Sequence, residues 1–196
     1  MHNAAYLPRE SLEHLGFASL GEDVLIHPSC VLVGCERMRI GSHVRIDPFC
    51  VVTMSADLVI GDRVHVSAHA SLLGEGGIVI GDFACVSHGA RVLSSSDDLS
   101  GGRICGPMVP PHHRHVVTGR IEIGRHAVLG ANAVILPGGG LGEGATVGAS
   151  SLVKDVLEPW TVNAGVPTRV VGRRDREGVL SQERLLADEP RRSPRS

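Results

Sequence analysis

A repeat with a fixed period limits what this chain can fold into more than any other feature. An Ile-Gly pair followed by one or two polar residues occurs as IGSH from 40, IGDR from 60, IGDF from 80 and IGRH from 123, and LGED from 20 and LGEG from 141 are variants. Between these pairs, aliphatic residues return every six positions, as in Ile60, Val66 and Leu72. This period fits neither an α-helix nor the alternating pattern of a simple hairpin strand.

The six-residue period instead predicts a coil of three short strands joined by tight turns. Three such units make an 18-residue coil, and the 20-residue spacing of Gly41, Gly61 and Gly81 adds about two residues at one corner. Stacked coils would form ladders of parallel strands about 4.8 Å apart. Their narrow interior suits Val and Ile, which agrees with only five aromatic residues (three Phe, one Trp, one Tyr) among 196. The predicted fold class is all-β: a parallel β-helix of about six coils.

The remaining segments suggest how the chain is organised around the repeat domain, which we place at 20–172. The stretch PRESLEHLG predicts a short helix within 1–19, which would cap the open first coil. A long external loop at 97–119 separates the fourth coil from the fifth. The end of the chain is charged and rich in Pro and Arg, so we predict that 173–196 forms a disordered tail.

Composition excludes several classes of protein. The formal net charge of −2 gives no general reason to expect binding to nucleic acid or to a membrane surface. The five cysteines form no CxxC motif, which favours free thiols in a reducing cytoplasm over a disulfide framework. Because no apolar run reaches the length of a membrane span and no signal core is present, we expect a cytoplasmic protein without membrane insertion.

The six-residue units resemble the left-handed β-helix of hexapeptide-repeat acyltransferases over about 20–172. The long loop, the segment IGRHAVLGANAVILPG after it and the ending NAGVPTRVVGR resemble galactoside and maltose O-acetyltransferases. The opening LGFASLGEDVLI and the pairing of GEGGI with SSSDDLSG are closer to bacterial acyltransferases of surface-polysaccharide clusters. The left hand follows from the resemblance alone, since the general rule for crossovers predicts a right-handed connection.

This resemblance implies an acetyl-CoA-dependent transferase that acetylates a hydroxyl or amine of a sugar, such as a nucleotide sugar or a surface-glycan intermediate. It also implies a homotrimer with sites between subunits, acetyl-CoA as cosubstrate and no metal. Such a reaction needs a base for the acceptor's proton, donors for the oxyanion and groups that hold CoA.

The catalytic base is the part of the family pattern that this sequence lacks. The relatives keep a histidine at the start of the loop in a Thr-x-His-Pro setting, and that position is Asp97 here, with Asp98 beside it. We therefore hypothesise that His69, one coil earlier, acts as the base and that Asp97 orients it. The alternative is an amine acceptor, which needs little help from a base.

Other histidines are weaker candidates for the site. His65 precedes a core aliphatic and should point outward, and His88 is expected at an exposed corner near the loop. His69 could equally be a polar corner residue, and Asp97 and Asp98 could be turn formers. The run HHRH from 112 favours a surface loop over a metal cluster, because adjacent histidines on a Pro-rich loop lack a fixed ligand geometry.

The last coils carry the positions that the resemblance assigns to CoA. Backbone N–H groups would hold the pantetheine amides, and cations would hold the adenosine phosphates. The matching residues are Gly130, Ala131, Ala149, Lys154, Thr168, Arg169 and Arg173. Their alternative is ordinary turn residues and surface charge.

Three other functions use related sequences. Antibiotic acetyltransferases usually show an Asn-His pair at the start of the loop, which is absent here. Zinc hydratases of the γ-carbonic-anhydrase type have four residues between two histidines of a coil, whereas His65 and His69 have three. A non-catalytic β-helix scaffold is disfavoured by the loop and by the CoA-like ending.

Overall fold

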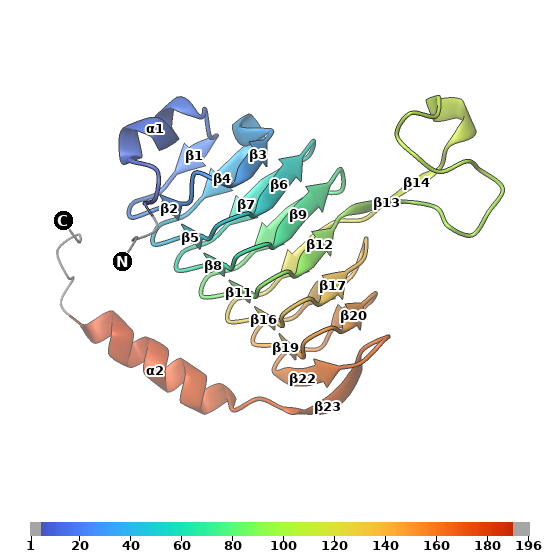
Figure 1. The fold of residues 1–196 in the computed structure, drawn as a ribbon. Helices are drawn as coiled ribbons and strands as arrows, with labels where there is room; N and C mark the ends of the chain where they lie inside the picture. The colour runs from blue at the N-terminus through green and yellow to red at the C-terminus, as the bar shows by residue number, and fades with distance from the viewer. Residues whose placement is uncertain (1–4, 190–196) are drawn as a thin grey trace.

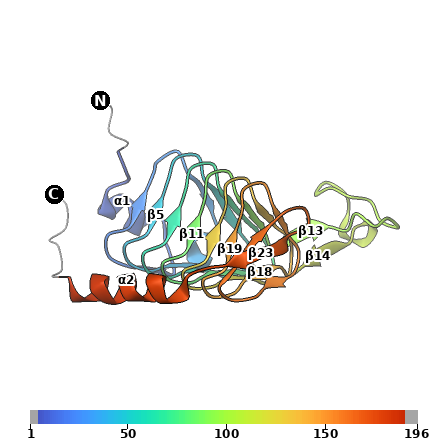
Figure 2. The same ribbon diagram turned by 90° about the horizontal axis from the view of Figure 1, so that it is seen from below.

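Each coil of the chain contributes one short strand to each of three parallel sheets, and the stacked coils form a triangular prism (Figures 1 and 2). The computed structural model describes residues 5–189. Strands of neighbouring coils pair at the predicted period, so that Ile40 pairs with Ile60 and Ile60 with Ile80. The predicted parallel β-helix is confirmed.

The strands are distributed over the three sheets, here called A, B and C, in coil order. Sheet A contains β1 (Ser19–Leu20), β4 (Met38–Ile40), β7 (Leu58–Ile60), β10 (Ile78–Ile80), β15 (Ile121–Ile123), β18 (Gly140–Leu141) and β21 (Val156–Leu157). Sheet B contains β2 (Leu25–Ile26), β5 (Arg45–Ile46), β8 (His65–Val66), β11 (Cys85–Val86), β16 (Val128–Leu129), β19 (Thr146–Val147), β22 (Thr161–Ala164) and the antiparallel β23 (Arg169–Arg173). Sheet C contains β3 (Val31–Val33), β6 (Val51–Met54), β9 (Ser71–Gly74), β12 (Arg91–Leu93), β17 (Val134–Ile135) and β20 (Leu152–Val153). Six coils are complete, and β21 and β22 form a partial seventh.

Coil length varies at one edge of the prism, where the chain passes from sheet C to sheet A. We call this the C–A edge, and the edge between sheets B and C the B–C edge. At the C–A edge, eight positions separate the core residues Val52 and Ile60, whereas six separate Ile135 and Leu141. A short 3-10 helix, η1 (Cys35–Arg37), occupies this edge in the first coil. The long loop is inserted at the same edge.

The interior of the prism is aliphatic, with small residues where the chain turns. In the fourth coil Ile80, Val86 and Val92 are completely buried, and Ala84 and Ala90 fill the turns. This regular packing fixes the outward side chains in straight rows on each face. Any functional group on a face is therefore held on a rigid support.

Two helices flank the prism, one at its N-terminal end and one along the side of the coils. Helix α1 (Arg9–His14) buries Leu12 against the first coil, which confirms the predicted N-terminal helix. The prediction of a disordered tail is wrong for 176–188, which form α2 (Arg176–Asp188). Asp175 caps this helix by accepting a hydrogen bond from the Gly178 N–H at 2.9 Å. Figures 1 and 2 show α2 running back along the coils.

The docking of α2 explains why the charged tail is ordered. Glu183 of α2 lies 2.7 Å from His126 Nε2 and also forms an ion pair with Arg125, so a carboxylate on the helix meets an imidazole and a cation on the coils. The rest of the predicted tail, beyond residue 189, lies outside the described residues. No helix within residues 5–189 is both long and apolar enough to cross a membrane.

Candidate active site

The loop leaves the C–A edge as an antiparallel hairpin that projects away from the prism (Figures 1 and 2). Its stem pairs β13 (Ser95–Asp97) with β14 (Val116–Thr118), and a 3-10 helix, η2 (Pro111–His113), lies near its tip. Ser94, which is fully buried, anchors the base of the stem by accepting a hydrogen bond from the Gly119 N–H at its carbonyl, at 3.0 Å. The stem therefore holds Asp97 and Asp98 at a defined position outside the core.

Asp97 is fixed by two donors from the far side of the loop. Its Oδ1 accepts hydrogen bonds from Arg114, at 2.9 Å from Nη2, and its Oδ2 accepts one from the Gly106 N–H at 2.8 Å. These bonds, that from Arg114 above all, hold the pKa of Asp97 below its ordinary value. The carboxylate is ionised at neutral pH, so it is a weak base but a good partner for a cation.

Asp98 is held in a similar way on the opposite side of the stem. It accepts from the Ser100 N–H at 2.8 Å and lies 3.1 Å from His115 Nδ1. The bonds from Ser100, followed by that from His115, lower the pKa of Asp98 to about 2. Both aspartates therefore also shape the loop. His112 and His113, by contrast, contact each other with their rings tilted by 49° and the ring centroids 4.1 Å apart.

The predicted pair of His69 and Asp97 is not formed within the chain. His69 lies at the B–C edge, where its exposed ring stacks on Phe49 at 5.1 Å. Asp97 extends from the C–A edge, on the other side of sheet C. A strand of three to four residues makes sheet C about 10–13 Å wide, which is too far for a hydrogen bond.

The B–C edge instead brings His88 beside the predicted CoA residues. The His88 carbonyl accepts a hydrogen bond from the Asn132 N–H at 2.9 Å, so exposed His88 stacks on the turn that contains Gly130 and Ala131. Ser87, which precedes His88, directly follows β11 of sheet B. Residues predicted for the acceptor and for the donor thus lie on one edge of the prism.

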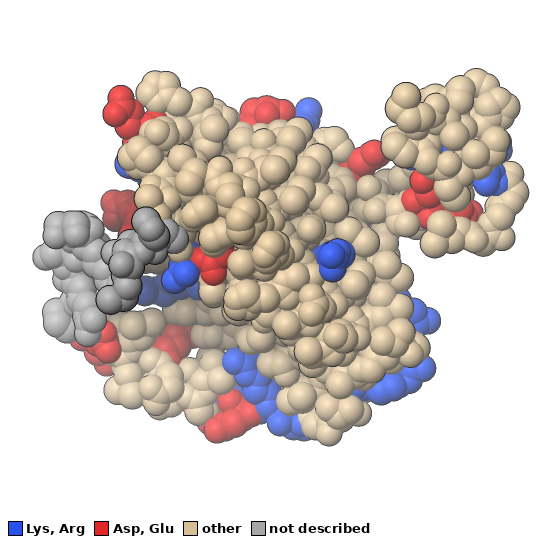
Figure 3. Space-filling view, viewed as in Figure 1, with Lys and Arg blue, Asp and Glu red and all other residues tan. Residues whose placement is uncertain are grey.

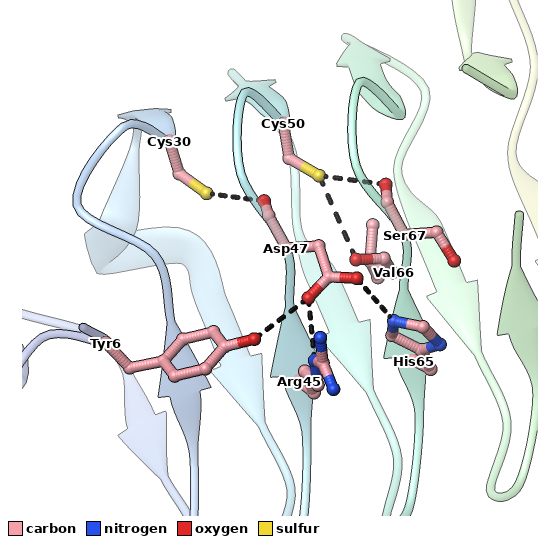
Figure 4. A network of polar contacts seen from close by, with 8 residues as sticks. All are labelled: Tyr6, Cys30, Arg45, Asp47, Cys50, His65, Val66 and Ser67. Atoms are coloured by element: carbon pink, nitrogen blue, oxygen red, sulfur yellow. Dashed lines mark hydrogen bonds and ion pairs between the residues drawn. The ribbon is translucent and has the colours of Figure 1, made fainter. Parts of the chain in front are cut away.

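His65 forms a partly buried contact with Asp47 on the face of sheet B (Figure 4). The side chain of Asp47 is 8% exposed and accepts from His65 Nε2 at 2.8 Å, Arg45 Nε at 2.6 Å and the Tyr6 hydroxyl at 3.0 Å. His65 points outward from β8, as predicted. The sequence did not reveal Asp47, Arg45 or Tyr6 as its partners.

The contacts in this cluster change the pKa values of both groups. Burial alone would raise the pKa of Asp47, but the hydrogen bonds from His65, Arg45 and Tyr6 bring it below its ordinary value. The neighbouring Cys85 side chain and Asp47 raise the pKa of His65 against the opposing effect of burial. The cluster therefore stabilises a carboxylate together with two cations.

The turns predicted to hold pantetheine offer free backbone donors. Gly130 donates its N–H to the Val147 carbonyl at 2.9 Å, within the ladder of coils. Ala131 and Ala149 occupy equivalent turns of neighbouring coils, and within residues 5–189 their N–H groups donate to no acceptor. Two parallel donors at one edge suit the amides of a pantetheine chain.

The remaining predicted CoA residues lie around the last coils. Lys154 is exposed at the C–A edge, 3.9 Å from Asp155, and Arg169 and Arg173 are exposed on β23. Thr168 is buried and donates its N–H to the Leu152 carbonyl at 2.9 Å, so this N–H is already used within the fold. Within the described part of the chain, no group of three or more His, Cys, Asp or Glu side chains is arranged to hold a metal ion.

No protein-family model matches the sequence. The prism with its single long hairpin nevertheless defines an acyltransferase of the hexapeptide-repeat class, and comparison with known proteins shows that the chain belongs to this family. It is 36% identical to dTDP-4-amino-4,6-dideoxy-D-glucose acyltransferase of Escherichia coli over 174 residues, which are 88% of this chain and 91% of the relative. The predicted left-handed β-helix, acyl-CoA donor and sugar acyltransferase activity are confirmed by these relatives.

The structure is also similar to AntD, an N-acyltransferase from Bacillus cereus. AntD in complex with dTDP and 3-hydroxybutyryl-CoA shares 35% identity and a TM-score of 0.89, covering 95% of this chain and 98% of AntD. Other AntD structures carry an aspartate replaced by alanine or asparagine. Further ones carry a serine, ten positions earlier, replaced by threonine, cysteine or alanine.

Proposed function

We propose that this chain transfers an acyl group from acyl-CoA to the 4-amino group of a dTDP-4-amino-4,6-dideoxy sugar. The observation that carries the proposal is Asp97, an ionised carboxylate fixed by Arg114 where other relatives keep a catalytic histidine. A carboxylate of low pKa holds an ammonium group well but removes a proton from a hydroxyl poorly. This chemistry favours an amine acceptor over a hydroxyl.

The spacing of Asp97 supports the same substrate class. Ser87 and Asp97 are ten positions apart, and no other serine in the sequence is followed by an aspartate at that distance. The serine and the aspartate altered in AntD have this spacing too. We therefore assign Ser87 and Asp97 to the acceptor site. Ser87 is not among the site residues predicted from the sequence.

In the proposed reaction the ammonium group held by Asp97 first releases one proton to solvent, and the resulting amine nitrogen attacks the thioester carbonyl of acyl-CoA. A C–N bond forms, the C–S bond breaks, and CoA leaves as a thiol after taking up the proton that the amine releases. Asp97 positions the amine. The N–H groups of Ala131 and Ala149, with the cations Lys154, Arg169 and Arg173, hold the donor along the B–C edge and the last coils. His69 and His88 remain candidate contacts beside the acceptor.

We further propose that the site forms between subunits of a homotrimer. Ser87 and Asp97 lie on opposite sides of sheet C, so a compact site containing both draws them from different subunits. Figure 3 shows few charged side chains on the prism face in view, and sheet C exposes Val31 and Val33 at 53% and 51%. Leu99 and Met108 of the loop are 82% and 94% exposed, as expected of a loop that packs on a neighbour.

A cytoplasmic location belongs to this proposal. All five cysteines are free, as in a reducing compartment.

The test is an assay of CoA release by the purified protein with dTDP-4-amino-4,6-dideoxyglucose, using acetyl-CoA and 3-hydroxybutyryl-CoA in turn. We expect turnover with at least one donor and an N-acylated product by mass spectrometry. Chloramphenicol serves as a comparison acceptor. Turnover with chloramphenicol and none with the amino sugar would overturn the proposal in favour of a xenobiotic acetyltransferase.

A further inference from the structure

The cluster around Asp47 (Figure 4) lies on sheet B, whose strand β11 is directly followed by Ser87. Acyl transfer itself makes no use of this cluster. In the register of sheet B, His65 pairs with Cys85 and Arg45 pairs with His65, so these two side chains lie one and two coils from the coil that carries Ser87. At a strand spacing of about 4.8 Å, these steps are about 5 and 10 Å.

On the parallel strands of sheet B, one row of outward positions shows where the cations lie; Arg169 and Arg173 are on the antiparallel β23 at the far end of the sheet. The outward positions equivalent to Arg45 on the parallel strands of sheet B are Leu25, Arg45, His65, Cys85, Val128, Thr146 and Val162. Only Arg45 and His65 of this row can be cationic near neutral pH. An anionic group of a ligand bound at Ser87 would therefore meet its nearest cations toward the N-terminal coils, because β8 and β5 are one and two strands from β11 and β23 is four strands away.

Asp47 orients both cations and leaves donors free. Arg45 bonds Asp47 through Nε, and its guanidinium lies 5.6 Å from the centre of the Tyr6 ring. Within residues 5–189 its two terminal nitrogens contact no acceptor, and the side chain is 53% exposed. His65 is 39% exposed beside it. A guanidinium held at Nε with both ends free is prepared to bind a phosphate group.

We propose that Arg45 and His65 bind the diphosphate of the nucleotide-sugar acceptor. This inference rests on the proposed function, in which the amine of the sugar lies at Ser87 and Asp97. The hexose ring separates that amine from the diphosphate, which places the phosphates along the row toward Arg45. Asp47 is then a positioning residue, and the contact with nucleotide is made by the two cations.

The test is calorimetric titration of the full chain with dTDP and, separately, with CoA. We expect Arg45→Gln and His65→Gln each to raise the Kd for dTDP by about tenfold or more, and to leave the Kd for CoA within about twofold of the parent protein. Arg39→Gln is the matched control, because Arg39 is 52% exposed and pairs with Asp57 on sheet A, away from this row. If Arg45→Gln unfolds, Arg45→Lys keeps the charge but loses the Nε donor, and a smaller rise in Kd is expected.

The outcomes separate this inference from the proposed function. Unchanged dTDP binding in both variants would overturn the diphosphate site while leaving the acyltransferase proposal intact. An equal loss of CoA binding would also overturn it, because the effect would then be structural. If the parent protein binds UDP and not dTDP, and Arg45→Gln abolishes UDP binding, the diphosphate site is supported and the dTDP acceptor is contradicted.

Discussion

At the scale of single residues, two aspartates show how this chain holds a negative charge in two different ways. Asp47 is buried and depends on three side-chain donors from the prism and the N-terminal segment. Asp97 is on an exposed stem and depends on Arg114 and Gly106 of its own loop. The first arrangement is rigid, and the second can present its carboxylate to a ligand.

Replacing Asp97 by Asn should strongly impair transfer. The neutral amide cannot hold an ammonium group, and hydrogen bonds to charged groups contribute about 1.5–3 kcal/mol, which corresponds to about tenfold to a hundredfold. We expect kcat/KM for the amino-sugar nucleotide to fall by at least about tenfold, with a nearly unchanged Tm. Asp57→Asn, at an exposed turn of the same edge, is the control. Equal kcat/KM in both variants would remove Asp97 from the site.

The pH dependence of stability should reveal the cluster around Asp47. The pKa of His65 is raised in the folded chain, so protonated His65 stabilises the fold below about pH 6.5, and this contribution is lost as the pH rises through the raised pKa. The Tm difference between the parent protein and His65→Gln should therefore be larger at pH 6 than at pH 8.5. Thermal unfolding scans at the two pH values measure it, and a difference that grows with pH would contradict the assigned contacts.

The sequence pointed to Asp97 but not to Asp47 for a physical reason. Asp97 is conspicuous because it stands where the repeat breaks. Asp47 and His65 are 18 positions apart and meet only because one follows and the other precedes the core residue of neighbouring 20-residue coils. Two outward positions related in this way are neighbours in every pair of coils, so such contacts can be predicted from the sequence once the register of the coils is known.

At the scale of elements, periodicity predicted the coils because every buried position repeats. Helix α2 was missed because its signal is weak and its composition resembles a disordered tail. None of its side chains is buried, and its docking depends on an ion pair with Arg125 and a polar contact with His126, which a reading of local composition does not detect.

The rows of buried aliphatics should carry most of the stability of each coil. Ile80 and Val79 are neighbours on β10, and Ile80 is completely buried while Val79 faces outward. Ile80→Ala should lower the free energy of unfolding by about 2–5 kcal/mol, because it leaves a cavity between stacked coils. Val79→Ala should cost clearly less. Denaturant titration compares them, and equal losses would contradict the assigned register.

At the scale of the whole molecule, the prism acts as a rigid support and the hairpin supplies what the prism lacks. The edges and faces of the prism hold the side chains and N–H groups proposed to bind acyl-CoA and the sugar nucleotide. The loop adds the carboxylate of Asp97, which lies on the other side of sheet C from Ser87. Because Ser87 on the prism and Asp97 on the hairpin lie on opposite sides of sheet C, the proposed site that uses both residues needs a second copy of the chain.

The proposed trimer can be tested through the exposed valines of sheet C. Light scattering coupled to size exclusion should give a mass of three chains for the parent protein. Val33→Asp places a charge in the proposed interface, so we expect a smaller species with little activity and retained β structure by circular dichroism. A monomeric parent protein with full activity would contradict a site built between subunits.

In the proposed site an ionised aspartate, in place of a histidine, selects an amine acceptor. The most direct measurement compares two acceptors that differ in one atom, dTDP-4-amino-4,6-dideoxyglucose and dTDP-6-deoxyglucose, with the same acyl-CoA. Mass spectrometry of the products should show acylation at the 4-amino group of the first and no product from the second. Acylation of the 4-hydroxyl at a comparable rate would contradict the account.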